Sequence, residues 1–284
     1  HKFSIKYRLK GNTGNSIGKD YSLKIKTKSK IFFNIQSFNL QPVSVKSYED
    51  EWLFHSMAEE MNLFKLNYFF IKLKLNNNDY LYAIEEHLHK NVIKNNNLNS
   101  GVIICYDESV ETLNYAHNQV ASSNLGRASF HIAPIKPYYK KHVFSNDTLT
   151  NDYIQAKKLL EGFREGSLST SQVFDIEKLS KLFVLCDLLG NFHPVEYRNI
   201  KFYYNPISNL IEPIPYDLNQ GIKSLNLNSE KNNKGIIGEV KDDFNWLKIA
   251  FSDSVFLKKY IKTLQHYSNC NLKSTFENSF NKLD

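Results

Sequence analysis

Residues 187–219, "DLLGNFHPVEYRNIKFYYNPISNLIEPIPYDLN", carry the pattern that decides the predicted fold. The stretch leaves an apolar helical segment, crosses a loop and continues as two short strands, "NIKFYYN" and "LIEPIPYD", joined by the turn "PISN". A hairpin places the start of its first strand beside the end of its second. We therefore expect Asn199 and Asp217 to be neighbours, with Asp187 and His193 at the same end of the helix.

The side chains that converge there are typical of a divalent-metal site. An Asn amide oxygen and an Asp carboxylate are hard ligands of the kind that Mg²⁺ uses when it also binds substrate phosphates. Taken singly, Asn199 has an alternative interpretation as a turn hydrogen-bonding residue, and Asp217 as an exposed turn acid. Together the two residues favour a metal site.

The rest of the second half is predicted to be mainly helical. The segment "DIEKLSKLFVLCDLLG" has an apolar face, with Asp175 as its N-cap and Gly190 as its C-cap. Further amphipathic segments are "TNDYIQAKKLLEGF", "DDFNWLKIAF", "SVFLKKYIKTLQHYS" and "LKSTFENSFNKL". Residues 99–148 have weak periodicity and yield no assignment.

The first third is predicted to be rich in strands. "KFSIKYRLK" and "YSLKIK" alternate apolar and polar residues on either side of the loop "GNTGNSIGKD", which indicates a hairpin. An acidic first turn and apolar residues at helical spacing predict a helix over residues 48–63, and "NYFFIKLKLNNNDYLYAIEEHL" predicts a second hairpin that turns at "NNND". The pattern is that of an α+β protein with a strand-rich N-lobe at residues 1–88 and a mainly helical C-lobe at residues 89–284.

Composition limits the class of protein. A chain of 284 residues with 42% hydrophobic content can bury a substantial core. The net charge of +7 suits an anionic ligand, but the lysines are spread along the chain without a recognition motif, so no nucleic acid is expected as a partner. No apolar run approaches the ~20 residues of a membrane span.

The three cysteines are too few and too far apart for a disulfide framework or a CxxC metal site. HExxH and GxGxxG motifs are absent from the sequence. The stretch "GNSIG" at residues 14–18 has the letters of GxSxG, but it lies in a loop between two predicted strands and does not enter a helix as a nucleophile elbow does. Hydrolase, zincin and Rossmann interpretations are therefore without support.

Two other segments are candidate ligand sites. The loop "GNTGNSIGKD" lacks the spacing and the final Ser or Thr of a P-loop. Its glycines can still bring backbone N–H groups close to phosphates, and the alternative is an ordinary flexible hairpin. The segment "EEHLHK" puts Glu85, His87 and His89 on one side of a strand, which is either a zinc-binding face or a solvated strand end.

Several of these segments, in order along the chain, resemble the CotH kinase-like family, which comprises spore coat protein H and its secreted relatives. The likeness extends from residue 5 to about residue 221. "IKYRLKGNTG" with "GKDYSLKIK" resembles the opening hairpin of the family, "EWLFHSMAEEMNL" its first helix, and "NYFFIKLKLNNNDYLYAIEEHLHKNVI" its next strand pair. The most specific match is the segment 187–219, where the family carries an acid or His, an Asn before an aromatic strand, and an aromatic-Asp pair after a Pro-containing strand.

The resemblance implies an atypical bilobal protein-kinase-like fold and transfer of phosphate from ATP to Ser or Thr of an acceptor protein, which is unknown. It implies that Asp217 and Asn199 hold Mg²⁺ or Mn²⁺, and it leaves the catalytic base open between Asp187 and His193. Secretion, or a location on the cell or spore surface, is a further expectation from the family.

The resemblance also implies nucleotide contacts from the N-lobe. Arg8, Lys19 and Lys24 become phosphate-binding residues, and Glu86 becomes a nucleotide-site residue at the end of the strand that joins the lobes. The alternative function is a non-catalytic binding protein on the same scaffold, because the sequence does not fix the base and the glycine loop is irregular.

Overall fold

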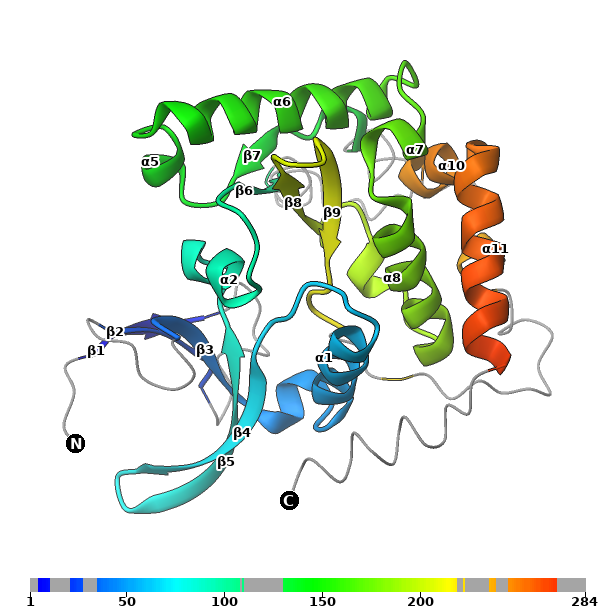
Figure 1. The fold of residues 1–284 in the computed structure, drawn as a ribbon. Coiled ribbons are helices and arrows are strands. Elements are labelled where there is room, and N and C mark those ends of the chain that lie inside the picture. The colour runs from blue at the N-terminus through cyan, green and yellow to red at the C-terminus, as the bar shows by residue number, and fades with distance from the viewer. Residues whose placement is uncertain are drawn as a thin grey trace, which may run out of the picture.

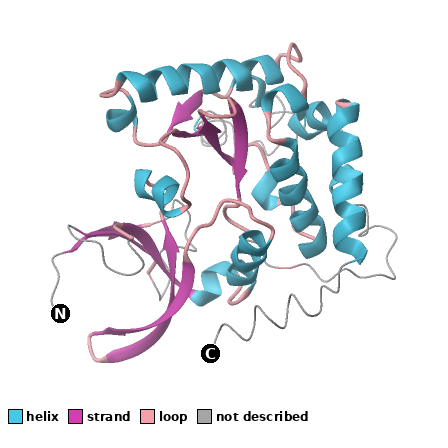
Figure 2. Ribbon diagram, viewed as in Figure 1, coloured by secondary structure: helices cyan, strands magenta, loops and turns pink. Residues whose placement is uncertain are grey.

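The computed structural model describes residues 5–10, 21–27, 35–107, 109, 130–218, 222, 235–238 and 245–269. Helices and two antiparallel sheets make up the regular structure, which confirms the predicted α+β class. In Figure 1 the first sheet lies in the lower part of the molecule, and the second sheet lies in the upper part among the long helices. Figure 2 shows the strands gathered in these two places. The glycine-rich loop with Lys19, and the helix predicted from "LKSTFENSFNKL", lie outside the described residues.

The first sheet contains five antiparallel strands in the order β1-β2-β3-β5-β4. They are β1 (Ile5–Leu9), β2 (Leu23–Thr27), β3 (Ser37–Pro42), β4 (Tyr68–Leu75) and β5 (Asn78–Glu86). Both predicted hairpins are confirmed, since β1 pairs with β2 and β4 pairs with β5. Asn76 and Asn77 turn the second hairpin with positive φ angles of 48° and 69°, which asparagine tolerates better than most residues. β3 is not assigned from the sequence, although Ser37, Asn39 and Gln41 alternate with Phe38 and Leu40. All of its residues are buried, and the polar face meets the buried Glu85 carboxylate in place of solvent.

The chain leaves β3 through a short 3₁₀ helix, η3 (Val43–Lys46), and then forms α1 (Asp50–Glu60). The helix predicted at residues 48–63 is thus confirmed, with Asp50 and Glu51 in its first turn. Glu51 is fully buried, although an acid in a first turn is usually solvated. The helix contacts both β4 of the first sheet and α8 (Ile176–Leu189) of the C-terminal half.

The second sheet has four antiparallel strands in the order β7-β6-β8-β9. They are β6 (Val102–Tyr106), β7 (Ile135–Pro137), β8 (Lys201–Asn205) and β9 (Leu210–Ile214). The predicted β8-β9 hairpin is confirmed. β6 lies in the region that yields no assignment from periodicity, because it is buried along its whole length. Gly101 leads into β6 so close to β8 that a Cβ would lie 2.5 Å from the carbonyl oxygen of Tyr204.

Helices surround the second sheet (Figure 1). Besides α8 they are α2 (Lys90–Asn95), α5 (Lys140–Val143), α6 (Asp147–Arg164), α7 (Thr170–Val173), η4 (His193–Val195), α9 (Gly235–Gly238), α10 (Asn245–Ser252) and α11 (Ser254–Asn269). The predicted caps of α8 are confirmed, since the Asp175 side chain accepts a hydrogen bond from the Lys178 N–H at 3.0 Å and Gly190 has a φ of 60°. Within the described ranges, no helix combines the length and the apolar character that crossing a membrane requires.

A large apolar core joins α1 to the C-terminal half. Phe54 of α1, Phe183 of α8 and Phe202 of β8 belong to it, and so does Leu218 in the loop after β9. A separate small cluster covers one face of the first sheet and consists of Ile25, Ile35, Phe38, Leu40, Tyr82 and Ile84. Because α1 and Leu218 share one core, the packing holds the loop after β9 against the first turn of α1.

Candidate functional site

Asp217 lies in the loop after β9 with an unusual backbone conformation. Its φ is 60°, in the left-handed region that residues other than glycine rarely adopt. The next residue, Leu218, is anchored on both sides, because its N–H donates to Glu51 at 3.1 Å and its carbonyl oxygen accepts from Asn191 at 2.9 Å. Strained backbone of this kind persists where the surroundings fix it, and it is concentrated at functional sites.

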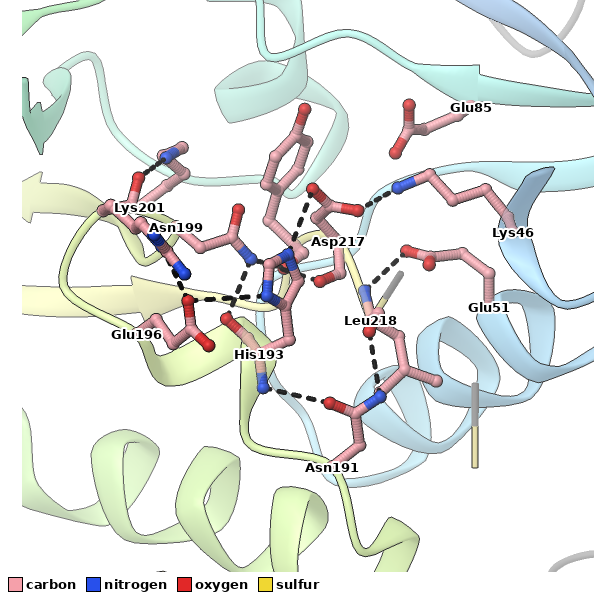
Figure 3. Close-up of polar contacts among 12 residues, drawn as sticks. Lys46, Glu51, Glu85, Asn191, His193, Glu196, Asn199, Lys201, Asp217 and Leu218 are labelled. Atoms are coloured by element: carbon pink, nitrogen blue, oxygen red, sulfur yellow. Dashed lines mark hydrogen bonds and ion pairs between the residues drawn. The ribbon is translucent and has the colours of Figure 1, made fainter. Parts of the chain in front are cut away.

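Asn199 lies beside Asp217, which confirms the predicted proximity. Its side-chain Nδ2 donates to the carbonyl oxygens of His193 at 3.0 Å, Tyr216 at 3.3 Å and Asp217 at 3.1 Å. Carbonyl oxygens only accept, so these contacts fix which end of the amide is the nitrogen. The amide oxygen of Asn199 therefore points away from the three carbonyls, as Figure 3 shows.

His193 lies between two carboxylates. Its Nε2 is 3.8 Å from Asp217 Oδ2, and its Nδ1 is 3.6 Å from Glu196 Oε2. Burial raises the pKa of Glu196, but the imidazole of His193 and the charge of Arg198 outweigh burial and hold this pKa below its usual value. Glu196 therefore stays ionised and available to orient the ring.

A pocket of about 250 Å³ opens onto these side chains. Its lining residues are Tyr138, His193, Arg198, Asn199, Lys201, Tyr216 and Asp217. The pocket thus combines two oxygen donors, an imidazole and two cationic side chains.

Lys46 and Glu51 complete the site from the opposite side, and sequence analysis does not identify them. Lys46 is buried at the end of η3, and its ammonium group forms an ion pair with Oδ1 of Asp217 (Figure 3). Burial alone would raise the pKa of Glu51. The charge of Lys46 and the hydrogen bond to His55 outweigh burial and hold this pKa below its usual value, so the carboxylate is ionised. A single lysine between two elements has no periodic signal, and Glu51 has the appearance of an ordinary acid in a first turn.

Glu85 is a second buried carboxylate near Lys46 (Figure 3). Its Oε2 accepts hydrogen bonds from Lys10 at 3.2 Å, Asn39 at 2.6 Å and Gln41 at 2.9 Å. Burial raises its pKa, but the charges of Lys10 and Lys46 hold the pKa well below the usual range. Glu85 therefore links β3 and β5 to the residue that follows β1, close to Lys46.

The structure does not support the interpretation of "EEHLHK" as a zinc face. The Glu85 carboxylate is held by Lys10, Asn39 and Gln41, and Nε2 of His87 accepts from the Lys24 ammonium at 2.5 Å. Within the part of the chain that the structure describes, no three His, Cys, Asp or Glu side chains form a group that could hold a metal ion.

Arg8 and Lys24 lie opposite each other on β1 and β2, and both line a second pocket of about 300 Å³. The other residues of its lining are Lys6, Tyr7, Lys26, Ser37, His89 and Tyr139. Burial, followed by the charges of Arg8 and neighbouring lysines, lowers the pKa of Lys24 to about 8. This concentration of positive charge is suited to an anionic ligand.

Glu86 does not lie with Lys46 and Asp217, and it does not line the basic pocket of Arg8 and Lys24. Its carboxylate accepts hydrogen bonds from the side chains of Asn67 at 2.5 Å and Asn95 at 3.1 Å. Neighbouring residues of a strand point to opposite faces, so Glu85 and Glu86 serve different sides of β5. The structure thus places Glu85 near Lys46 and Asp217, and it places Glu86 where it links β5 to α2.

Asp187 is also held away from Asp217. Its Oδ1 accepts from the N–H of Ile236 in α9 at 2.6 Å, and its Oδ2 accepts from the hydroxyl of Tyr260 in α11. Burial raises the pKa of Asp187 to about 6, although both hydrogen bonds act in the opposite direction. The carboxylate connects α8 to α9 and α11.

We expect Asp187→Asn to remove a pH dependence of stability. The folded-state pKa of about 6 lies above the ordinary value of 3.8, so the folded protein binds this proton more tightly and loses stability as pH rises from about 4 to 6. The shift corresponds to about 3 kcal/mol. Urea unfolding at pH 4 and pH 7 measures this effect. The free energy of unfolding of the variant minus that of the parent should increase by up to this amount from pH 4 to pH 7. Asp79→Asn, at an exposed residue of β5, should show no such gain. Parallel pH profiles of the parent and Asp187→Asn would contradict the assignment.

The donor set at Asp217 and Asn199 fits a magnesium ion that shares its coordination with phosphates. Such ions are typically held by one or two carboxylates, with substrate oxygens and water supplying the remaining ligands. Asp217 provides a carboxylate that is 21% exposed, and Asn199 provides an amide oxygen on the same pocket. Searches for similar proteins found no matching family model and no significantly similar curated protein.

Proposed function

We propose that this chain is an ATP- and divalent-metal-dependent phosphotransferase of the protein-kinase-like type that acts on Ser or Thr of proteins. One observation carries the proposal. Lys46, which follows β3 of the first sheet, forms an ion pair with Asp217, which follows β9 of the second sheet. Glu51 and Asn199 flank this pair. The kinase-like arrangement of two lobes, the CotH likeness and a secreted or surface location belong to the same proposal.

The arrangement parallels the working parts of protein kinases. In those enzymes a lysine from the N-lobe, a glutamate from a helix, and an aspartate and an asparagine of the C-lobe position the nucleotide phosphates and the metal ions. Here Lys46, Glu51, Asp217 and Asn199 supply the same four chemical groups, with the glutamate again on a helix and the lysine on a 3₁₀ helix in place of a strand. Positioning and charge neutralisation are the main requirements of phosphoryl transfer.

Each side chain then has a role that follows from its contacts. Asp217 and Asn199 would hold the divalent ion, which supplies positive charge to the transferring phosphoryl group. Lys46 contacts Asp217 and can turn to a phosphate, while Glu51 remains near it and anchors Leu218. His193 is the better candidate for the base than Asp187, because its ring lines the pocket of Asp217 whereas the Asp187 carboxylate is engaged by α9 and α11.

The basic pocket provides a place for the phosphates or the outer part of the nucleotide. Arg8 and Lys24 line it together with Tyr139, and the preceding residue, Tyr138, lines the pocket of Asp217. The two pockets are therefore connected through adjacent residues of one loop. Lys19 remains a proposed phosphate contact from the loop between β1 and β2.

The alternative, a non-catalytic binding protein on the same scaffold, is favoured by one specific observation. The ammonium group of Lys46 occupies Oδ1 of Asp217, so a metal ion must displace it or use the other oxygen. If that pair never opens, the pockets could bind an anion without transferring phosphate.

Phosphate transfer from labelled ATP to a mixture of acceptor proteins, and to the chain itself, tests the proposal. We expect transfer with Mg²⁺ or Mn²⁺ and none with a chelator. His193→Gln should lower transfer by about 10² to 10⁴-fold, the usual contribution of a general base, while leaving metal-dependent stabilisation by ATP unchanged. His266→Gln on α11 is the matched control and should leave transfer unchanged. Stabilisation without transfer in the parent would support the alternative. The absence of both stabilisation and transfer would contradict both functions.

A further inference from the structure

A third pocket, which we call the α2–α5 pocket, has a composition unlike the other two. It has a volume of about 320 Å³ and is lined by Lys90, Ile93, Lys94, Leu98, Ser100, Gly101, Val102, Ile103, Tyr138, Tyr139, His142, Val143 and Leu149. Most of these side chains are apolar, and the polar ones include two lysines and a histidine but no acid. Small-molecule pockets typically have such an apolar wall, a few convergent polar groups and a volume of 300 Å³ or more.

The two lysines lie on the face of α2 that borders the pocket. Lys90 and Lys94 are four residues apart, and Ile93 falls between them on the same side of the helix. Like charges at this spacing repel each other, and an anion between them removes that repulsion. Among the described residues, no carboxylate forms an ion pair with either lysine. This rim of the pocket is thus charged without a partner of opposite sign in the described part of the chain.

His142 lies on α5 at the other side of the opening, where its ring can donate a hydrogen bond to a ligand. The pKa of the nearby His89 is lowered to about 4, first by burial and then by the charges of Lys26 and Lys90. The charge of Lys90 thus acts on a neighbouring group. The rim therefore favours a ligand with a negative head group.

The interior of the pocket is apolar and is formed by buried residues. Ile103 belongs to the buried strand β6, and Val143 and Leu149 are buried in the large core. Gly101 lines the pocket where the chain packs closely on β8, since a Cβ there would collide with the carbonyl oxygen of Tyr204 and the ring of Tyr203. Buried walls of this kind offer an apolar group a largely preformed binding place.

We infer that the α2–α5 pocket binds a small amphipathic anion, with a carboxylate head between Lys90, Lys94 and His142 and a short apolar tail against Ile103 and Leu149. The inference does not rest on the proposed phosphotransferase function. The ligand would contact Tyr138 and Tyr139, which also line the two other pockets. Binding in the α2–α5 pocket would therefore also affect the walls of those two pockets.

Methyl-labelled protein titrated with sodium octanoate tests the inference by NMR. We expect the methyl signals of Ile93, Ile103, Val143 and Leu149 to shift in a saturable manner. Acetate, which has the head without the tail, and octylamine, which has the opposite charge, should bind at least about tenfold more weakly. Equal binding of octanoate and octylamine, or of octanoate and acetate, would overturn the inference.

Matched charge variants locate the head group. Lys90→Gln combined with Lys94→Gln should weaken octanoate binding by about tenfold, because two partly exposed ion pairs are lost. Lys140→Gln combined with Lys141→Gln removes the same charge from exposed residues of α5 that do not line the pocket, and it should have little effect. Equal weakening in both double variants would overturn the inference in favour of a general effect of charge. Selective binding of an acidic, leucine-containing peptide in place of octanoate would overturn it in favour of a peptide-docking site.

Discussion

Asp217→Asn is expected to lower phosphate transfer by about 10³-fold and to abolish the metal-dependent part of stabilisation by ATP. Among the described residues that line the pocket of His193 and Asn199, the substitution removes the only carboxylate. Asparagine is the appropriate replacement because it has nearly the same shape and tolerates the φ of 60° at this position. Alanine would add backbone strain to the loss of charge, and the two effects could not be separated.

Thermal unfolding with and without Mg²⁺ measures the binding part of this prediction. A ligand present at a hundredfold its Kd stabilises a folded protein by about 2.7 kcal/mol, which is a shift of roughly 5 °C for a chain of this size. The parent should show this shift only when ATP and metal are both present, and Asp217→Asn should not show it. Asp79→Asn removes the same charge from an exposed residue of β5 and should respond like the parent. A metal-dependent shift that persists in Asp217→Asn would show that Asp217 does not hold the metal.

Local patterns in the sequence predict the elements of the fold that carry a clear alternation, a recognisable turn, an acidic first turn or caps. The hairpins β1-β2 and β4-β5, the helix α1 and the capped helix α8 are all of this kind. The strand β6 is missed because it is apolar and buried throughout, and burial on both faces removes the alternation on which the prediction depends. The strand β3 does alternate, but its polar residues are buried against Glu85, a contact that no local pattern reveals.

The candidate site is predictable only in the part that lies close along the sequence. Asn199 and Asp217 are brought together by a single hairpin, and the turn chemistry of that hairpin is visible in the sequence. Lys46 is 171 residues from Asp217, and no local pattern encodes a contact over that distance. The same limit applies to Asp187, which the sequence places near the end of a helix close to His193 but which accepts hydrogen bonds from Ile236 and Tyr260 of distant helices.

Lys46→Met is expected to destabilise the fold by about 3 kcal/mol at neutral pH, because it leaves the buried Glu51 carboxylate without its neighbouring lysine and leaves Glu85 with the charge of Lys10. Lys46 holds down the pKa of both Glu51 and Glu85, and both carboxylates are almost completely shielded from solvent. A carboxylate whose folded-state pKa is depressed contributes stability above its unfolded value of about 4.5, and this contribution is lost as pH falls. The difference between the parent and Lys46→Met should therefore be largest near pH 7 and should narrow below about pH 4.5.

A double-mutant cycle separates the charge effect from the loss of the lysine's apolar contacts. Glu51→Gln keeps an oxygen that can accept from the Leu218 N–H, and it removes one of the carboxylates that Lys46 neutralises. Lys46→Met should therefore cost less in the Glu51→Gln background than in the parent. Lys65→Met is the control for an exposed ion pair, since Lys65 and Glu59 are 44% and 52% exposed, and it should cost less than about 1 kcal/mol. If Lys46→Met costs the same at pH 4 and pH 7 and in both backgrounds, Lys46 stabilises the protein through packing, and its charge does not hold Glu51 in the ionised form beside Asp217.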